Sequence, residues 1–161
     1  MSLKHPLIRY HGGKFRLADW IISHFPSHET YVEPFGGGAS VLLSKLPSRM
    51  EVYNDLDSEV VNFFEVLRDQ QLAEKLAEQI ELTPYAREEF LNARVETNDK
   101  VELARRLVVR AQMGFGSAGA TKGNTGFRLD TARGGSDIVT IWQRQPEVIL
   151  QAAARLKNVL I

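Results

Sequence analysis

A chain of 161 residues is long enough for one domain with a buried core, and its 20 basic and 20 acidic side chains give a formal net charge of zero. The absence of cysteine excludes disulfides and thiolate metal sites, and the four histidines lack metal-ligand spacing with nearby carboxylates, so we expect no metal. No apolar run approaches the roughly 18 residues of a membrane span and no signal peptide is apparent, so we expect a cytoplasmic protein without a membrane partner.

The first 46 residues predict two glycine turns that each lead into a helix. Apolar residues recur at helical spacing over 17–25, after Gly12-Gly13, and that helix should end near Pro26. A β-prone run at 30–32 then leads through three consecutive glycines into helix-like residues 39–46. This is the strand, turn and helix order with which an α/β protein presents backbone N–H groups to a nucleotide-like ligand.

The three consecutive glycines at 36–38 and the acid at 55 indicate the kind of ligand. Glycine suits such a turn because a Cβ would block the ligand's approach and because tight turns often need positive φ. Asp55 lies 22 residues beyond Glu33, after a second β-prone run at 51–53. An acid at about that distance holds ribose hydroxyls in dinucleotide-binding folds. The phosphate-binding GxGxxG spacing is absent, which favours an adenosine ligand without phosphates.

The remainder of the chain predicts helices and one glycine-rich segment. Asp57 is placed to cap a helix over 58–67, an apolar stripe continues over 72–80, and Thr83-Pro84 is typical of a helix start. Asp99 and Glu102 resemble a capping box for the next helix. Residues 114–136 favour an irregular loop or β-hairpin. Pro146 starts a last helix, and residues 158–161 open a strand.

Charge is distributed unevenly along the chain. Residues 1–50 carry 6 basic and 3 acidic groups, residues 51–104 carry 5 and 14, and residues 105–161 carry 9 and 3. Between Leu103 and Leu129 there are five basic residues and no acid. A chain with no net charge can therefore still have a basic face suited to phosphates. The alternative is that these basic residues form a solvated helix face, balanced by the acidic residues of 51–104.

Three motifs in order resemble the D12 class of DNA adenine-N6 methyltransferases, the Dam-like enzymes. The motifs are Tyr10-His11-Gly12-Gly13-Lys14, Glu33-Pro34-Phe35-Gly36-Gly37-Gly38 and Asn54-Asp55-Leu56-Asp57. The resemblance implies an α/β, Rossmann-like S-adenosylmethionine-dependent methyltransferase fold with an incomplete sheet and a mostly helical target-recognition insertion. It also implies methyl transfer from S-adenosylmethionine to adenine in double-stranded DNA, in the setting of DNA methylation or restriction–modification.

The resemblance assigns a cofactor role to most of these motif residues. Lys14 suits the methionine carboxylate, Phe35 and the three glycines form a floor under the cofactor, and Asp55 accepts hydrogen bonds from ribose hydroxyls. Glu33 either joins the site or anchors the loop, and Tyr10 either packs on the cofactor or belongs to the core. The predicted cofactor-binding residues are Tyr10, Gly12, Gly13, Lys14, Glu33, Phe35, Gly36, Gly37, Gly38 and Asp55.

The segment 114–136 occupies the place of the family's target-recognition hairpin. Its polar side chains have the chemistry to meet base edges and phosphates, and the alternative is a surface loop. It does not match the Dam enzymes residue by residue, so no target sequence is implied. The predicted DNA-binding residues are Arg105, Arg110, Lys122, Asn124, Thr125 and Arg128.

The family's Asp-Pro-Pro-Tyr motif is not found in these 161 residues, since no two of the six prolines are adjacent. We therefore predict no catalytic residue here and expect an inactive N-terminal part of a methyltransferase. Its alternatives are a truncated enzyme and one half of a split enzyme, whose partner would be a C-terminal half that carries the motif. The expected division is a cofactor-binding α/β part at 1–68, a helical DNA-binding region at 69–157 and the start of a truncated strand at 158–161. An incomplete sheet predicts self-association through its exposed edge.

Two other readings remain open. One is a non-catalytic DNA-binding or restriction–modification accessory module. The other is an unrelated nucleotide-binding Rossmann enzyme that uses NAD or a nucleoside triphosphate, although the Walker A spacing is absent as well.

Overall fold

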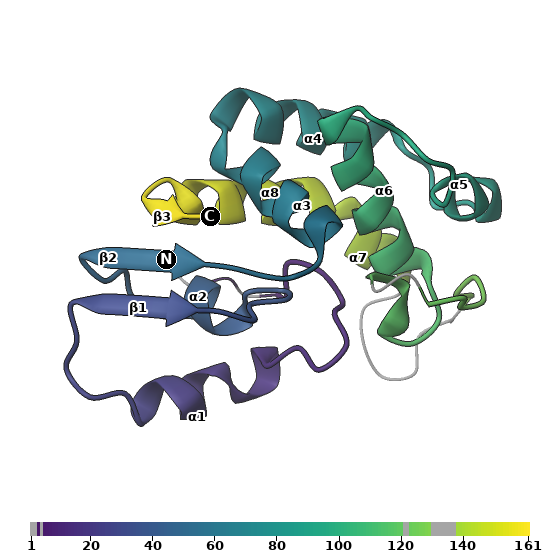
Figure 1. Cartoon of the computed structure of the whole chain (residues 1–161). Coiled ribbons are helices and arrows are strands. Elements are labelled where there is room, and N and C mark those ends of the chain that lie inside the picture. The colour runs from purple at the N-terminus through teal and green to yellow at the C-terminus, as the bar shows by residue number, and fades with distance from the viewer. Residues whose placement is uncertain (1–2, 4, 121–122, 130–137) are drawn as a thin grey trace.

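A computed structural model describes residues 3, 5–120, 123–129 and 138–161. The described residues contain a three-stranded parallel sheet in the order β1-β2-β3. The strands are β1 (Thr30–Glu33), β2 (Met50–Tyr53) and β3 (Val159–Leu160). Figure 1 shows this sheet at one end of the molecule, with α5 and the segment after α6 at the other.

Helices make up most of the remaining described chain. A 3-10 helix over Phe15–Leu17 leads into α1, and a second one covers Ala118–Ala120. The α-helices are α1 (Ala18–Ser23), α2 (Ser40–Ser44), α3 (Ser58–Arg68), α4 (Gln70–Leu82), α5 (Arg87–Asn92), α6 (Lys100–Met113), α7 (Ile138–Gln143) and α8 (Gln145–Leu156). This mixed composition with a small parallel sheet agrees with the predicted α/β class. None of the helices in the described residues combines the length and apolar character needed to cross a bilayer.

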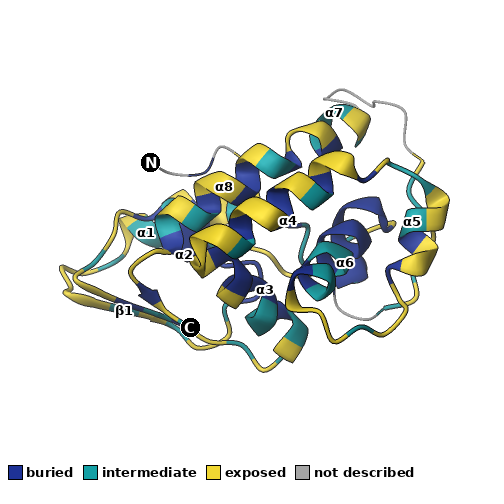
Figure 2. Cartoon of the chain, turned by 90° about the horizontal axis from the view of Figure 1, so that it is seen from above, coloured by how far each residue is buried: buried dark blue, intermediate teal, exposed yellow. Residues whose placement is uncertain are grey.

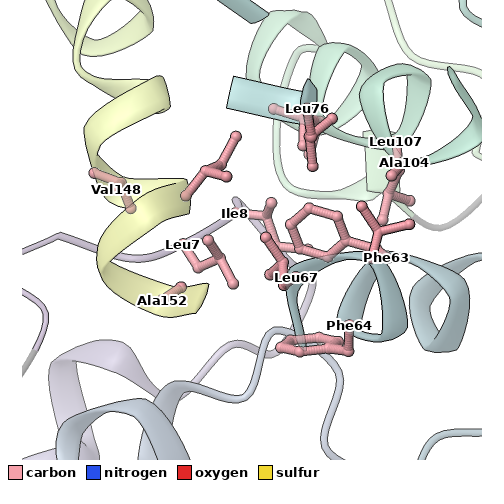
Figure 3. Close-up of a cluster of buried hydrophobic side chains, with 14 of the residues drawn as sticks. Leu7, Ile8, Phe63, Phe64, Leu67, Leu76, Ala104, Leu107, Val148 and Ala152 are labelled. Carbon is pink, nitrogen blue, oxygen red and sulfur yellow. The ribbon is translucent and has the colours of Figure 1, made fainter. Parts of the chain in front are cut away.

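The core lies where α3, α4, α6 and α8 meet. Figure 3 shows Phe63, Leu67, Leu76 and Leu107 from three of these helices around one centre, and all four side chains are fully buried. Residues 7 and 8 of the N-terminal segment enter the same cluster. In Figure 2, α4 and α8 run side by side with exposed outer faces and buried inner faces. Most of the apolar positions read from the sequence face this core, but Leu150 of α8 is 43% exposed, and Val148 and Ala152 are buried on that helix instead.

A buried ion cluster fixes the sheet to the helices behind it. The Glu51 carboxylate on β2 lies 2.6 Å from Lys45 Nζ, after α2, and 2.6 Å from Arg155 Nη1 on α8. Burial alone would raise the pKa of Glu51, but the hydrogen bonds from Arg155 and Lys45 outweigh it and hold the pKa below its ordinary value. The cluster thus ties residue 155 to a strand about a hundred residues earlier in the chain.

Several predicted helix ends are confirmed. Asp57 caps α3 by accepting a 2.9 Å hydrogen bond from Glu59 N, and Asp99 caps α6 through a 2.8 Å bond from Glu102 N. The capping box at Asp99 is only half present, because Asp99 N donates to Thr97 Oγ1 while the Glu102 carboxylate pairs with arginines. Pro146 lies in the first turn of α8 as expected.

The helix start predicted at Thr83-Pro84 is wrong. Thr83 ends α4, and its hydroxyl donates a 2.7 Å hydrogen bond back to Gln79 O. The next helix, α5, begins at Arg87 after Ala86. Thr83 is buried, and its side chain bonds to the preceding helix, α4. Its carbonyl oxygen accepts a 2.8 Å hydrogen bond from Trp142 Nε1. Thr83 and Pro84 therefore lie in the connection between α4 and α5.

The segment after α6 turns back on itself. Gly114 and Phe127 form an isolated antiparallel bridge, with Phe115 N to Gly126 O and Arg128 N to Met113 O both at 2.7 Å. The described part of 114–136 therefore has the hairpin character that the sequence allowed.

Candidate functional site

A cavity of about 410 Å³ lies at the carboxyl end of β1. Residues 10–14 form one wall, and residues 32–38 with Ser40 and Val41 form the other. Two motifs that are about 20 residues apart in the sequence thus face each other across one space. The volume falls within the about 300–1,000 Å³ of small-molecule sites.

The glycine loop after β1 has its shape fixed by neighbouring groups. Gly36 N donates to Asn54 O at 2.9 Å, and Tyr53 Oη donates to Gly37 O at 2.7 Å. A Cβ on Gly36 would lie 2.2 Å from the Tyr53 ring, and Gly37 has φ of +50° with a would-be Cβ 2.6 Å from the Tyr10 ring. Two of the three glycines are therefore required by packing and backbone conformation before any ligand is considered.

Asp55 supports this loop from behind. Its Oδ2 accepts a 2.8 Å hydrogen bond from Gly37 N, and its Oδ1 accepts one of 3.0 Å from Asp57 N. Asp55 is not among the residues that line the cavity. The geometry gives its carboxylate a role in positioning the glycine loop, and the predicted contact with ribose hydroxyls stays a prediction.

Glu33 lines the cavity and anchors the helix that follows it. Its Oε1 accepts hydrogen bonds from Tyr31 Oη at 2.7 Å and from Leu42 N of α2 at 2.8 Å. Its Oε2 is buried and has no hydrogen-bond partner among the described residues. Burial raises the pKa of Glu33, and the hydrogen bonds from Tyr31 and Leu42 only partly oppose that rise. The sequence predicts two roles for Glu33, a ligand contact and an anchor for the loop. The hydrogen bonds from Tyr31 and Leu42 support the anchoring role.

The first motif supplies the opposite wall. Gly13 N donates to Tyr10 O at 3.0 Å and closes the turn, and the Tyr10 side chain packs with its ring beside Gly37 and its Cβ beside Gly38. Burial, followed by the charges of Asp55 and Asp57, raises the pKa of Tyr10. Lys14 is exposed at the rim, with Nζ donating to Gly12 O. The turn therefore leaves a cation at the edge of the cavity.

Two apolar side chains stand exposed just beyond the strands. Phe35 follows β1 and is 87% exposed, and Leu56 follows β2 and is 94% exposed. The loops that carry them are joined by the bond between Gly36 N and Asn54 O. Phe35, which the sequence analysis selected, lines the cavity, and Leu56 does not.

The arginines of α6 face inward and do not form an open basic surface. Arg105 lies 2.9 Å from Glu89 and 2.7 Å from Glu102. Arg110 is buried, pairs with Glu59 and donates a 2.7 Å hydrogen bond to Ala93 O. This geometry favours a structural role for Arg105 and Arg110 over the predicted DNA contact. All three partner acids come from the acidic middle of the sequence, so part of the charge of that segment is paired with arginines of α6.

The remaining predicted DNA contacts lie near the turned-back segment. Asn124 Oδ1 and Thr125 O both accept hydrogen bonds from Arg94, the second at 3.1 Å. Arg128 O accepts a 2.9 Å bond from Tyr85 Oη. Lys122 lies outside the described residues. Arg94, which the sequence analysis did not select, is thus the residue that fixes this segment to α5.

Over the described ranges, no group of three or more histidine, aspartate or glutamate side chains is arranged to hold an ion.

Comparison with known proteins gives a consistent result. The model of the family described as D12 class N6 adenine-specific DNA methyltransferase matches residues 10–115. A DNA adenine methylase of Haemophilus influenzae is 35% identical over 69 residues, which are 42% of this chain and 24% of that protein. DNA adenine methylases of Escherichia coli K12 and Salmonella typhi are each 32% identical over 68 residues, with the same two shares. The matched segment spans about a quarter of the length of these relatives.

Proposed function

The chain belongs to the D12 class of N6 adenine-specific DNA methyltransferases, and on that premise we propose that the cavity beside β1 holds the methyl donor S-adenosylmethionine. The family implies a methyl donor, and S-adenosylmethionine supplies an electrophilic methyl group on its sulfonium. The single observation that carries the proposal is the convergence of the Tyr10–Lys14 and Glu33–Gly38 segments on one cavity of about 410 Å³.

The residues around the cavity suit the parts of this ligand. Exposed Phe35 lines the cavity and offers an aromatic surface to the adenine ring, because an aromatic side chain gains by covering a planar base. The close-packed glycine loop lets the ligand approach the backbone. Lys14 at the rim offers a cation to the methionine carboxylate. We place the cavity at the carboxyl end of the strands of a Rossmann-like sheet, where such folds bind nucleotides.

The proposed substrate is adenine in double-stranded DNA, with the methyl group transferred to N6. These 161 residues contain no Asp-Pro-Pro-Tyr sequence, and inactivity of this chain by itself stays a prediction. Binding of the cofactor is the property that this cavity predicts directly. The accessory-module reading differs in expecting DNA binding without methyl transfer.

Calorimetry with two adenosine ligands tests the site. We expect S-adenosylhomocysteine to bind, and Lys14→Ala to weaken it about 10-fold or more, as for loss of a charge-assisted hydrogen bond. Methylthioadenosine has no carboxylate, so Lys14→Ala should leave its affinity unchanged. Arg16→Ala removes a nearby exposed cation that does not line the cavity and serves as the control.

The opposing results are equally specific. Tight binding of NAD or ATP with none of S-adenosylhomocysteine would favour the unrelated Rossmann enzyme. An equal effect of Lys14→Ala on both adenosine ligands would remove Lys14 from the carboxylate end.

A further inference from the structure

A second cavity, of about 390 Å³, lies between the N-terminal segment, the end of α6, the segment at Arg128 that follows the Gly114–Phe127 bridge, and the junction of α7 with α8. Three arginines line it, Arg9, Arg128 and Arg144, from three separate parts of the chain. None of the described lining residues is acidic. We call this space the arginine cavity.

The walls between the arginines are largely apolar. Pro6, Ile141 and Val148 contribute them, and Val148 is buried. Charges beside apolar walls face a lower effective dielectric than charges in open water, so an anion there is attracted more strongly. A guanidinium also matches the oxygens of a phosphate in a bidentate arrangement.

The floor of the cavity is fixed by buried amides. Gln145 is 2% exposed and donates a 2.6 Å hydrogen bond to Leu7 O, and Gln112 Nε2 donates to Gln145 Oε1 at 2.9 Å. These bonds connect the N-terminal segment to α6 and to the start of α8. Hydrogen bonds between buried groups therefore hold together the distant segments that form the arginine cavity.

The two cavities share one stretch of chain. Arg9 lines the arginine cavity and Tyr10 lines the cofactor cavity, and the Cα atoms of adjacent residues are about 3.8 Å apart. An anion held by Arg9 would therefore be bound one residue along the chain from the wall of the cofactor cavity. For a methyltransferase of DNA, the anions that must come closest to the cofactor are the phosphates flanking the target nucleotide.

We propose that the arginine cavity binds a backbone phosphate of the DNA substrate next to the methylation site, with Arg144 as one of its phosphate ligands. This inference rests on the proposed function. It assigns the DNA contact to residues that line this cavity, among them Arg9 and Arg144, which the sequence pattern did not single out, in place of Arg105 and Arg110 of α6. Arg128 is the one predicted DNA contact that it retains.

Arg144 offers the cleanest test. It is exposed, and in the described part of the chain its side chain makes no ion pair or hydrogen bond, so Arg144→Gln should fold normally. We expect the variant to weaken duplex binding about tenfold. The slope of log Kd against log salt should fall by about 0.9, the value for one phosphate contact. Arg144→Lys keeps the charge and should restore the slope.

Arg49→Gln is the matched control. Arg49 is an exposed arginine directly before the amino end of β2, and it pairs with Glu29. Its removal should leave the slope of log Kd against log salt unchanged. An unchanged slope for Arg144→Gln, with duplex binding intact in wild type, would overturn the proposal. A slope lost equally in both arginine variants would also overturn it, because it would report net charge alone.

Inorganic phosphate separates DNA from other phosphate sources. Titrated at constant ionic strength, it should shift the Arg144 Nε–Hε signal of wild type in NMR spectra, and duplex DNA should compete. A phosphate shift that duplex DNA does not displace would assign the cavity to a small phosphorylated ligand and overturn the DNA contact. Affinity for S-adenosylhomocysteine, measured on the same samples, reports the proposed function separately and should not change in Arg144→Gln.

Discussion

Two carboxylates near the glycine loop direct their oxygens at the protein's own backbone. Asp55 holds Gly37 and Asp57 by their N–H groups, and Glu33 holds Leu42. Sequence spacing located both acids correctly beside the loop but could not distinguish a ligand contact from a loop contact. That distinction depends on where the loop folds back, which no spacing in the sequence specifies.

Replacing Asp55 with alanine should lower affinity for S-adenosylhomocysteine by about 10- to 150-fold, since a hydrogen bond to a charged group contributes about 1.5–3 kcal/mol. Calorimetry measures the affinity, and proton exchange of the Gly37 amide reports the loop. Loss of affinity with faster exchange would identify Asp55 as a positioning residue. Loss of affinity with unchanged exchange would identify a direct ligand contact, and unchanged affinity would exclude both.

Glu33→Gln should change how stability depends on pH. Because burial raises the folded-state pKa of Glu33, its contribution to stability is fully present below the unfolded pKa of 4.5 and is lost as pH rises through the folded pKa. The glutamine variant lacks this loss. Urea unfolding at pH 4 and pH 7.5 measures this. The free energy of unfolding of the variant, relative to that of wild type, should be higher at pH 7.5 than at pH 4. Glu33→Ala leaves Leu42 N–H without its acceptor and should destabilise at both pH values.

At the scale of elements, the strands and most helices follow from local pattern. The β-prone runs at 30–32 and 51–53 become β1 and β2, and the apolar stripes become α3, α4, α6 and α8. The failure at Thr83 has a local cause, since the same pair of residues can end one helix or begin another. The pairing of β2 with β3 joins residues more than a hundred positions apart, and local pattern carries no information on that pairing.

The ion pairs of α6 belong to this scale as well, because they join α6 to α3 and α5. Arg110→Ala should lower the free energy of unfolding by about 3 kcal/mol, since it removes a buried guanidinium that pairs with Glu59 and donates a hydrogen bond to Ala93 O. Urea unfolding of Arg110→Ala, Glu59→Ala and the double variant measures the coupling, which should exceed about 0.5 kcal/mol. A stable Arg110→Ala variant with weaker DNA binding would instead restore the original DNA assignment.

For the whole molecule, one face of the sheet is open. Val32, Val52 and Leu160 are aligned by the strand register, as are Thr30 and Met50. Val32, Met50 and Leu160 are each about half exposed, at 51%, 48% and 54%. Parallel sheets are usually covered on both faces, so an apolar open face favours association with another surface.

Met50→Lys should reduce self-association of the chain. Sedimentation velocity over a range of concentrations measures it, and we expect the average mass of wild type, but not of the variant, to rise with concentration. Leu46→Lys adds the same charge at an exposed leucine outside the sheet and should behave as wild type. A wild-type protein that stays monomeric at all concentrations would contradict the prediction.

Tyr53 and Tyr10, which pack against the glycine loop, limit which residues can replace Gly36 and Gly37. The Tyr53 ring fills the volume that a side chain at position 36 would need, and the Tyr10 ring does the same at position 37. Gly36→Ala should thus be tolerated only together with a smaller residue at position 53, as a compensatory pair. Position 37 carries the additional demand of positive φ and has no such partner solution. A library that varies positions 36 and 53 together should recover folded variants that neither single-site library contains.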